Sequence, residues 1–254
     1  MYQTDMQIES QKEEPVELSD AHCHLSLFDS VDEVLKQASE KNIKTIVTAG
    51  GSNRDNEKTL EIVKHDNVFG VIGISPDAVG EGLDTEQLEQ MIKKSKKIVG
   101  IGEIGLDFKI AKDSESRNAQ AAVFEKQVDL AKELDLPIVI HSRRALPYVI
   151  NILVEKKIEK AMFHFFEGGK KEHVEEIKRR GYIISVPPVR SEERERAIKE
   201  VDINSIVAET DSPVVGKSPI DVINSLSIIS SVRNMDVNEI AEITTNNLRE
   251  FFYI

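Results

Sequence analysis

Cysteine is almost absent from this chain of 254 residues, and basic residues are outnumbered by acidic ones. The single cysteine, Cys23, excludes an internal disulfide framework and favours a reducing compartment, so we expect a cytoplasmic protein. Lysine and arginine number 33 against 45 aspartate and glutamate residues, and the resulting net charge of -12 argues against strong non-specific binding of nucleic acid. No uncharged apolar run reaches about 18 residues, so we expect no membrane-spanning helix and no membrane partner.

The N-terminal residues differ from the rest of the chain. They are acidic and lack the basic and apolar regions of a signal peptide. We expect residues 1–17 to form a flexible arm and residues 18–254 to form one domain. Nothing in the sequence indicates an obligate protein partner, and the oligomeric state stays open.

Apolar, β-branched runs alternate with charged amphipathic stretches from one end of the chain to the other. The runs that we interpret as buried parallel strands are Val16–Cys23, Ile43–Ala49, Val68–Ile74, Ile98–Ile104, Ile138–His141, Lys160–His164, Tyr182–Val186 and Ser205–Glu209. The stretches that we interpret as helices between them are Asp32–Lys41, Glu57–His65, Thr85–Lys94, Arg117–Leu134, Ala145–Lys157, Lys170–Arg180 and Glu192–Glu200.

This alternation predicts the α/β class and a single (β/α)8 TIM barrel, because β-α repeats pair their strands in parallel through right-handed crossovers. Two extra C-terminal helices, near Asp221–Arg233 and Asn238–Phe252, are expected to pack on the outside of the barrel. An open doubly wound sheet is the competing fold. It usually has a glycine-rich loop after its first strand, whereas here that strand runs into His22-Cys23-His24.

The end of the first strand carries two histidines suited to holding a metal ion. Residues two apart on a strand share one face, so Asp20, His22 and His24 are expected to point into the barrel together. Cys23 is expected to point the other way and to pack as an apolar residue. Catalytic sites of such barrels lie at the C-terminal ends of the strands, which makes this histidine pair a candidate metal site.

Four further residues of metal-binding type fall where predicted strands end: Glu103, His141, His164 and Asp211. Each is a weak signal alone, but their common position at one end of a barrel would bring all six side chains together. The remaining histidines, His65 and His173, lie on charged helical stretches and are interpreted as solvated.

Four imidazoles and two carboxylates offer nitrogen and oxygen ligands for divalent ions of the Zn, Mn, Mg, Co, Fe or Ni class. Six ligands exceed the needs of one tetrahedral ion. We therefore expect two divalent metal ions sharing a bridging carboxylate, an arrangement that clamps the attacking and leaving oxygens of a displacement reaction.

From about Leu18 to its C-terminus, the chain resembles the TatD family of metal-dependent deoxyribonucleases, within the amidohydrolase-like barrels. The segments that carry the resemblance are Asp20-Ala-His-Cys-His24-Leu25, Gly102-Glu-Ile-Gly-Leu-Asp107, Pro137-Ile-Val-Ile-His141-Ser-Arg143, Glu209-Thr-Asp211-Ser-Pro213 and, more weakly, Thr244-Thr-Asn-Asn247. The resemblance implies that His22, His24 and Asp211 hold one metal ion. It also implies that His141 and His164 hold the other and that Glu103 bridges the two. Asp211 would in addition orient or deprotonate the attacking water.

Three loops depart from the family pattern: Gly73-Ile-Ser-Pro-Asp77 replaces a Gly-x-His-Pro-His motif, Phe165-Phe-Glu167 replaces Cys-Phe-Ser, and the loop after Asp211 is short. The departures weaken the case for a DNA strand and leave the ligands intact. The leading function is a TatD-like deoxyribonuclease or phosphodiesterase acting on DNA or a nucleic-acid-derived substrate. The alternatives are a metal-dependent carboxylic ester or amide hydrolase, including an aminoacyl-RNA deacylase, and a catalytically silent binding barrel.

Three further residues receive roles from their positions. Arg143 lies two residues after His141, and its planar guanidinium suits a substrate phosphate or carboxylate, although a surface salt bridge is an equal alternative. Asp20 and Glu209 each lie two residues before a ligand on the same strand face. They are expected to support the ligands from behind or to bind metal themselves.

Overall fold

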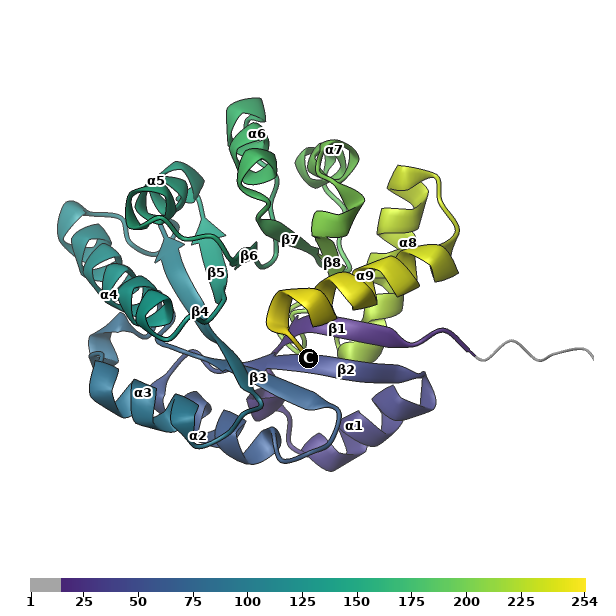
Figure 1. Cartoon of the computed structure of the whole chain (residues 1–254), viewed down its shortest axis with the longest axis horizontal. Coiled ribbons are helices and arrows are strands. Elements are labelled where there is room, and N and C mark those ends of the chain that lie inside the picture. The colour runs from purple at the N-terminus through teal and green to yellow at the C-terminus, as the bar shows by residue number, and fades with distance from the viewer. Residues whose placement is uncertain (1–14) are drawn as a thin grey trace, which may run out of the picture.

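In the computed structural model, which describes residues 15–254, eight parallel strands are paired in chain order and alternate with helices (Figure 1). The strands are β1 (Leu18–Cys23), β2 (Ile43–Ala49), β3 (Val68–Ile72), β4 (Ile98–Asp107), β5 (Ile138–Arg143), β6 (Ala161–Phe163), β7 (Ile183–Val186) and β8 (Ile206–Ala208). The helices are α1 (Val31–Glu40), α2 (Asn53–Ile62), α3 (Thr85–Lys93), α4 (Ser114–Glu133), α5 (Leu146–Lys156), α6 (Lys171–Arg180), α7 (Glu192–Glu200), α8 (Val222–Arg233) and α9 (Val237–Phe252).

The sheet closes on itself through the segment that follows β8. The backbone N–H of Asp211 donates to the carbonyl of His22 at 2.9 Å, and the N–H of His24 donates to the carbonyl of Ser212 at 2.7 Å. The last strand segment therefore lies beside the first, as the predicted (β/α)8 barrel requires, and the fold prediction is confirmed.

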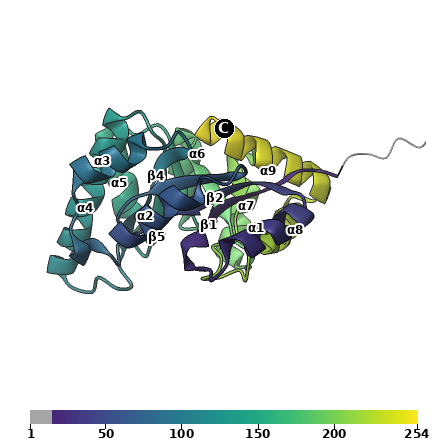
Figure 2. The ribbon, with the colours of Figure 1, turned by 90° about the horizontal axis from the view of Figure 1, so that it is seen from below.

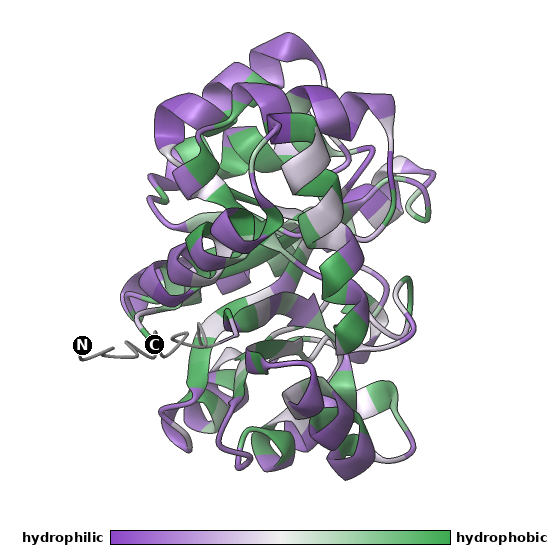
Figure 3. Ribbon diagram, turned by 90° about the vertical axis from the view of Figure 1, so that its right-hand side faces the viewer, coloured by the Kyte–Doolittle hydropathy of each residue, from purple (hydrophilic) through white to green (hydrophobic). Residues whose placement is uncertain are grey.

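The apolar core has two parts because successive strand residues face opposite sides of the sheet. The inner part lines the barrel with a residue from every strand: Ala21, Val47, Val71, Val99, Val139, Met162, Ile183 and Val207. The outer part joins the other strand face to the helices, as Ile138 and Ile140 on either side of Val139 illustrate. Hydrophilic residues cover the outward sides of the helices (Figure 3).

The C-terminal helix α9 closes one end of the barrel instead of packing only on its outside, which corrects the expected placement. Leu248 and Phe252 belong to the inner apolar cluster, and the Oγ of Ser19 on β1 lies 3.1 Å from the Oγ1 of Thr245. Figure 2 shows α9 next to β1, and α9 also packs against β8. The inner side chains at the N-terminal ends of the strands need an apolar cover, and α9 supplies it.

Several elements differ in length from their predicted ranges, and two differences bear on the site. β4 and β5 continue to Asp107 and Arg143 because their ladder extends through the pairs Gly105 with His141 and Asp107 with Arg143. Glu103 and His141 consequently lie within strands and not at their ends.

The N-terminal boundary of the domain is held by side chains from elsewhere in the fold. The side-chain amide of Asn42 donates to the carbonyls of Pro15 and Val16, at 2.7 and 2.8 Å, and Arg249 pairs with Glu17 at 2.6 Å. Residues 1–14 of the expected arm lie outside the described residues. Between residues 15 and 254, no helix has the length and apolar character needed to cross a membrane.

Candidate metal centre

The six predicted ligands converge at the C-terminal ends of the strands. They come from β1, β4 and β5, from the residues that directly follow β1 and β6, and from the third residue after β8. Two candidate metal-binding groups of nitrogen and oxygen atoms contain Glu103, and a third joins His22, His164 and Glu209.

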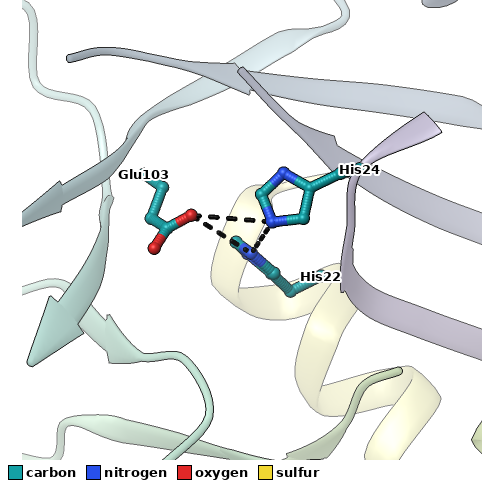
Figure 4. A group of neighbouring side chains, drawn as sticks. All are labelled: His22, His24 and Glu103. Carbon is teal, nitrogen blue, oxygen red and sulfur yellow. Dashed lines mark hydrogen bonds and ion pairs between the residues drawn. The ribbon is translucent and has the colours of Figure 1, made fainter. Parts of the chain in front are cut away.

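The first group contains His22, His24, Glu103 and Asp211. Figure 4 shows the two imidazoles turned toward the Glu103 carboxylate, with their Nε2 atoms 3.3 Å apart. The Nε2 of His24 lies 3.6 Å from Glu103 Oε2 and 3.2 Å from Asp211 Oδ1. The corresponding distances from His22 Nε2 are 3.8 and 3.9 Å.

The second group contains the other oxygen of the same glutamate. Glu103 Oε1 lies 2.7 Å from His141 Nδ1 and 3.0 Å from His164 Nε2, and those two nitrogens are 3.3 Å apart. The rings of His164 and His22 stack with their centroids 4.0 Å apart, so the two groups are adjacent. Glu103 therefore presents one oxygen to each group.

The spacing and chemistry of these atoms fit metal ions. Two nitrogens that bind one tetrahedral ion at about 2.0–2.1 Å lie roughly 3.3 Å from each other. Within each group the imidazole nitrogens face each other at that separation, and one carboxylate oxygen completes the set. Mixed histidine and carboxylate ligands suit first-row divalent ions.

Burial and neighbouring charges shift the pKa values of the side chains in these two groups. Burial, followed by the charges of His164 and His24, holds the pKa of His22 well below its usual value, which favours the neutral imidazole that metals bind. Burial alone would raise the pKa of Glu103. The charge of His164 and the hydrogen bonds from His141 and His164 hold it well below its usual range instead, so the carboxylate is ionised.

His141 reaches the site because a glycine opposite it leaves room for close strand approach. Gly105 on β4 pairs with His141 at a φ of +145°, a region that side-chain-bearing residues rarely adopt. A Cβ atom on Gly105 would lie 2.0 Å from the carbonyl oxygen of His141. The glycine thus sets the distance between the strands that carry Glu103 and His141.

The structure adds a residue to which the sequence reasoning gave no role, Asp107. Its Oδ2 lies 3.2 Å from His141 Nε2, so the opposite nitrogen, Nδ1, faces Glu103. Metal-bound histidines commonly donate their other N–H to a carboxylate in this way. Asp107 lies four residues after Glu103 on the same strand, and the shared strand face is the signal that could have found it.

Glu209 and Asp20, the two acids expected behind the ligands, lie in different surroundings. Glu209 Oε2 is 3.8 Å from His164 Nδ1, and its carboxylate accepts from the Phe165 N–H at 2.6 Å and from the Ser185 hydroxyl. Burial, with the charge of Asp211 adding to it, raises the pKa of Glu209 to about 7. Glu209 thus lies behind the ring of His164, and it also forms a possible metal-binding group with His22 and His164.

Asp20 contacts the backbone beside a ligand instead of an imidazole. It accepts from the N–H of Thr210 at 2.9 Å and from the Thr210 hydroxyl at 2.5 Å. Asp20 also accepts from the backbone N–H of His22 at 3.3 Å, and the pairing of β1 with β2 shifts register between Asp20 and Cys23. Its contacts fix the residue before Asp211, and no metal-binding group that includes Asp20 forms among residues 15–254.

Arg143 and Arg144 have different surroundings. Arg143 is half-buried on the face of β5 that carries Val139 and His141, and its guanidinium makes no ion pair in the part of the chain that the structure describes. Arg144, which follows with a φ of +56°, lines a hollow beside His164. The surface salt bridge weighed for Arg143 is therefore absent among the described residues.

Known proteins resemble this chain in sequence. Residues 19–253 match the family model described as TatD related DNase. The deoxyribonuclease TATDN3 of Homo sapiens is 32% identical, covering 93% of this chain and 95% of the relative. An uncharacterized metal-dependent hydrolase of Methanocaldococcus jannaschii, MJ1582, is 30% identical over 93% of this chain and 97% of its own.

Solved structures share the fold. The crystal structure of YJJV, a TatD homologue from Escherichia coli, superposes with a TM-score of 0.85 over 93% of this chain and 98% of that chain, at 24% identity. With a family model matching nearly the whole described barrel, the chain belongs to the TatD related DNase family and is a metal-dependent hydrolase.

Proposed function

We propose that this protein is a two-metal-ion phosphodiesterase that cleaves DNA at or near strand ends. The observation that carries the proposal is the position of Glu103, whose two carboxylate oxygens face two separate histidine groups. The name of the human relative, deoxyribonuclease, supports DNA as the substrate class.

The residues divide between two ions in the proposed site. His22, His24 and Asp211 would hold one ion and His141 and His164 the other, with Glu103 between the two histidine groups. Bound ions would supply Lewis acidity, which would lower the pKa of water and stabilise charge on phosphoryl oxygens. Asp211, 3.2 Å from His24 Nε2, accepts the proton of the attacking water. Glu103 keeps the two histidine groups at a fixed distance from each other.

A substrate panel tests the proposal. With Mg²⁺, Mn²⁺, Zn²⁺ or Co²⁺ added in turn, the purified protein is expected to cleave single-stranded DNA and bis(p-nitrophenyl) phosphate faster than p-nitrophenyl acetate or an aminoacyl-RNA ester. Cleavage of the carboxylic esters alone would instead favour an acyl hydrolase on the same barrel. Metal-loaded protein without any hydrolysis would favour a silent binding barrel.

Arg143 is proposed to bind the phosphate of the substrate, because it shares a strand face with His141 and lacks an ion-pair partner among residues 15–254. Arg143→Ala is expected to lower kcat/KM on DNA about tenfold or more, mainly through KM, since one charge-assisted hydrogen bond contributes roughly 1.5–3 kcal/mol. The matched control is Arg179→Ala, which removes an exposed arginine that pairs with Glu176 on α6. Equal kcat/KM for the two variants would contradict this role.

Metal affinity is expected to rise with pH. Burial lowers the pKa of His141, but hydrogen bonds with Asp107 and Glu103 outweigh burial and raise this pKa to about 10. Burial likewise lowers the pKa of His24, but the hydrogen bond with Asp211 and the charge of Glu103 outweigh it and raise this pKa to about 9. Both imidazoles must lose their proton to bind an ion, so binding between about pH 6 and 8 releases protons and tightens as pH increases.

Calorimetry with Zn²⁺ in buffers of different ionisation enthalpy measures this proton release. Asp107→Asn is expected to flatten the pH dependence, because it removes one of the groups that hold the proton on His141. The variant should also bind metal about 10–100-fold more weakly, as is common when a supporting carboxylate is lost. Zn²⁺ affinity that does not change with pH would contradict the expectation.

A further inference from the structure

A hollow of about 330 Å³ opens beside His164, between the residues that follow β5 and those that follow β6. Its apolar lining consists of Leu146, Pro147, Phe163 and Phe166. His164 lines the same hollow, and its Nε2 is 3.0 Å from Glu103. A group seated here would therefore adjoin the candidate metal centre.

Two glycines keep one wall of the hollow free of side chains. Gly168 and Gly169 have φ values of +92° and +151°. A Cβ on Gly168 would lie 2.6 Å from the backbone of Glu193, and one on Gly169 would lie 2.9 Å from Leu146. The chain is thus restricted to glycine where a flat ligand could lie against its backbone.

The charges around the hollow are of both signs. Arg144 and Lys170 lie on its edge together with Glu167 and Glu193. Lys170 lies 4.0 Å from Glu172, but no ion pair joins Arg144 or Lys170 to Glu167 or Glu193 in residues 15–254, so donors and acceptors remain for a ligand. A second phosphate would meet two carboxylates, whereas a flat group with both donors and acceptors on its edge would find partners of each kind.

His173 completes the hollow with an aromatic ring. The sequence interpretation made it a solvated helix residue, but it is half-buried at the start of α6, and its Nδ1 lies 3.6 Å from the position of a Cβ on Gly169. Imidazole rings stack on nucleobases in nucleic-acid-binding proteins.

We propose that this hollow binds the nucleobase of the nucleotide next to the scissile phosphate. The proposal rests on the proposed phosphodiesterase function and adds a subsite to it. His173 and the apolar side chains contact the face of the base, while Arg144 and Glu167 bind its edge. A base must leave its neighbours in the duplex to enter, so the subsite favours frayed or single-stranded ends.

Calorimetric binding of two ligands that differ only in the base tests the subsite. Deoxyadenosine 5′-monophosphate is expected to bind the metal-loaded protein at least about tenfold more tightly than 2-deoxyribose 5-phosphate, within the range for stacking one base on an aromatic side chain. His173→Ala should bring the two affinities close to each other, whereas His173→Phe, which keeps a ring, should retain most of the preference. His65→Ala, on the opposite end of the barrel, is the matched control.

Equal affinities in the wild-type protein, no binding of either ligand at millimolar concentration, or an unchanged preference in His173→Ala would each overturn the subsite. The outcome is separable from that of the proposed function. Preference for the nucleotide without cleavage of any phosphodiester would refute the proposed function and support the hollow as a base-binding site. Cleavage of DNA without preference for the nucleotide would refute the subsite alone.

Discussion

Glu103→Gln is expected to reduce both the metal content and the activity of this protein. The wild-type protein should bind about two divalent ions per chain under metal-replete conditions, and the variant about one. The expected loss in kcat on DNA is at least about 10²–10³-fold, the range for removing one preorganised electrostatic group from a catalytic site. The amide keeps the shape of the side chain but cannot offer two anionic oxygens to two histidine groups.

The expectation follows from the position of Glu103 at the centre of the ligand set. Its Oε2 is 3.6 Å from His24 Nε2 and its Oε1 is 2.7 Å from His141 Nδ1. Among residues 15–254, Glu103 is the carboxylate found in both of these groups, while Glu209 forms a separate group with His22 and His164. With the amide in place, the imidazoles remain, and one group can still hold an ion with Asp211.

Metal analysis by mass spectrometry, steady-state kinetics and circular dichroism measure the effect together. Circular dichroism is needed because Glu103 is buried, and loss of the fold would also abolish activity. Glu61→Gln is the control, since Glu61 is exposed on α2 and pairs with Lys64. Two ions per chain and wild-type kcat in the Glu103 variant would show that the carboxylate does not bridge.

The fold could be predicted because hydrophobic periodicity is a local property of the sequence. The run Ile138-Val139-Ile140 indicates a strand buried on both faces, and in the structure its residues do divide between the outer and the inner core. The ends of strands were harder to predict, because they depend on pairing with a neighbour. β4 extends to Asp107 only because β5 continues beside it to Arg143.

Hydrophobic periodicity does not predict where α9 lies in the fold. Its sequence indicates an amphipathic helix but not which surface it covers. The barrel interior opens at the N-terminal ends of the strands, and Leu248 and Phe252 fill that opening beside Val71 and Val99. The position of α9 depends on the closed barrel as a whole, so the sequence of this one helix does not determine it.

The candidate site was predicted where alternation along a strand holds, and less well where it breaks. His141, expected at the end of the fifth strand, lies on β5 with its Nδ1 2.7 Å from Glu103 Oε1. β1 has a register shift between Asp20 and Cys23, and β4 has one between Ile101 and Ile104. The Asp20 carboxylate accepts from the backbone N–H groups of His22 and Thr210 and from the Thr210 hydroxyl, contacts that counting by twos along a strand does not predict.

Those contacts matter for the backbone at Asp211. Asp20 accepts from both the N–H and the hydroxyl of Thr210, and the next residue, Asp211, has a φ of +49°. This left-handed conformation is uncommon outside glycine, although aspartate and asparagine tolerate it best. A further bond from the Asp211 N–H to the His22 carbonyl fixes the turn against β1. The carboxylate is thereby aimed at the histidine pair by hydrogen bonds that do not involve the carboxylate itself.

Asp211→Asn is therefore expected to preserve the fold and remove most of the activity. Asparagine keeps the shape of the side chain and tolerates the same φ, but it cannot accept a proton from the attacking water. Hydrolysis of DNA should fall at least about 10²-fold in kcat, the lower range for the loss of a general base.

Asp135→Asn is a closely matched control, because Asp135 is exposed, has a φ of +52° and lies between α4 and β5, away from the ligands. Any effect of the substitution on a left-handed backbone appears in both variants, while the effect on the site appears only in the Asp211 variant. Kinetics are measured at saturating metal, with metal content determined on the same samples. A metal-replete Asp211→Asn protein with wild-type turnover would show that another group takes the proton. Low turnover at full metal content, with Asp135→Asn unaffected, is the result that the geometry of Asp211 and His24 leads us to expect.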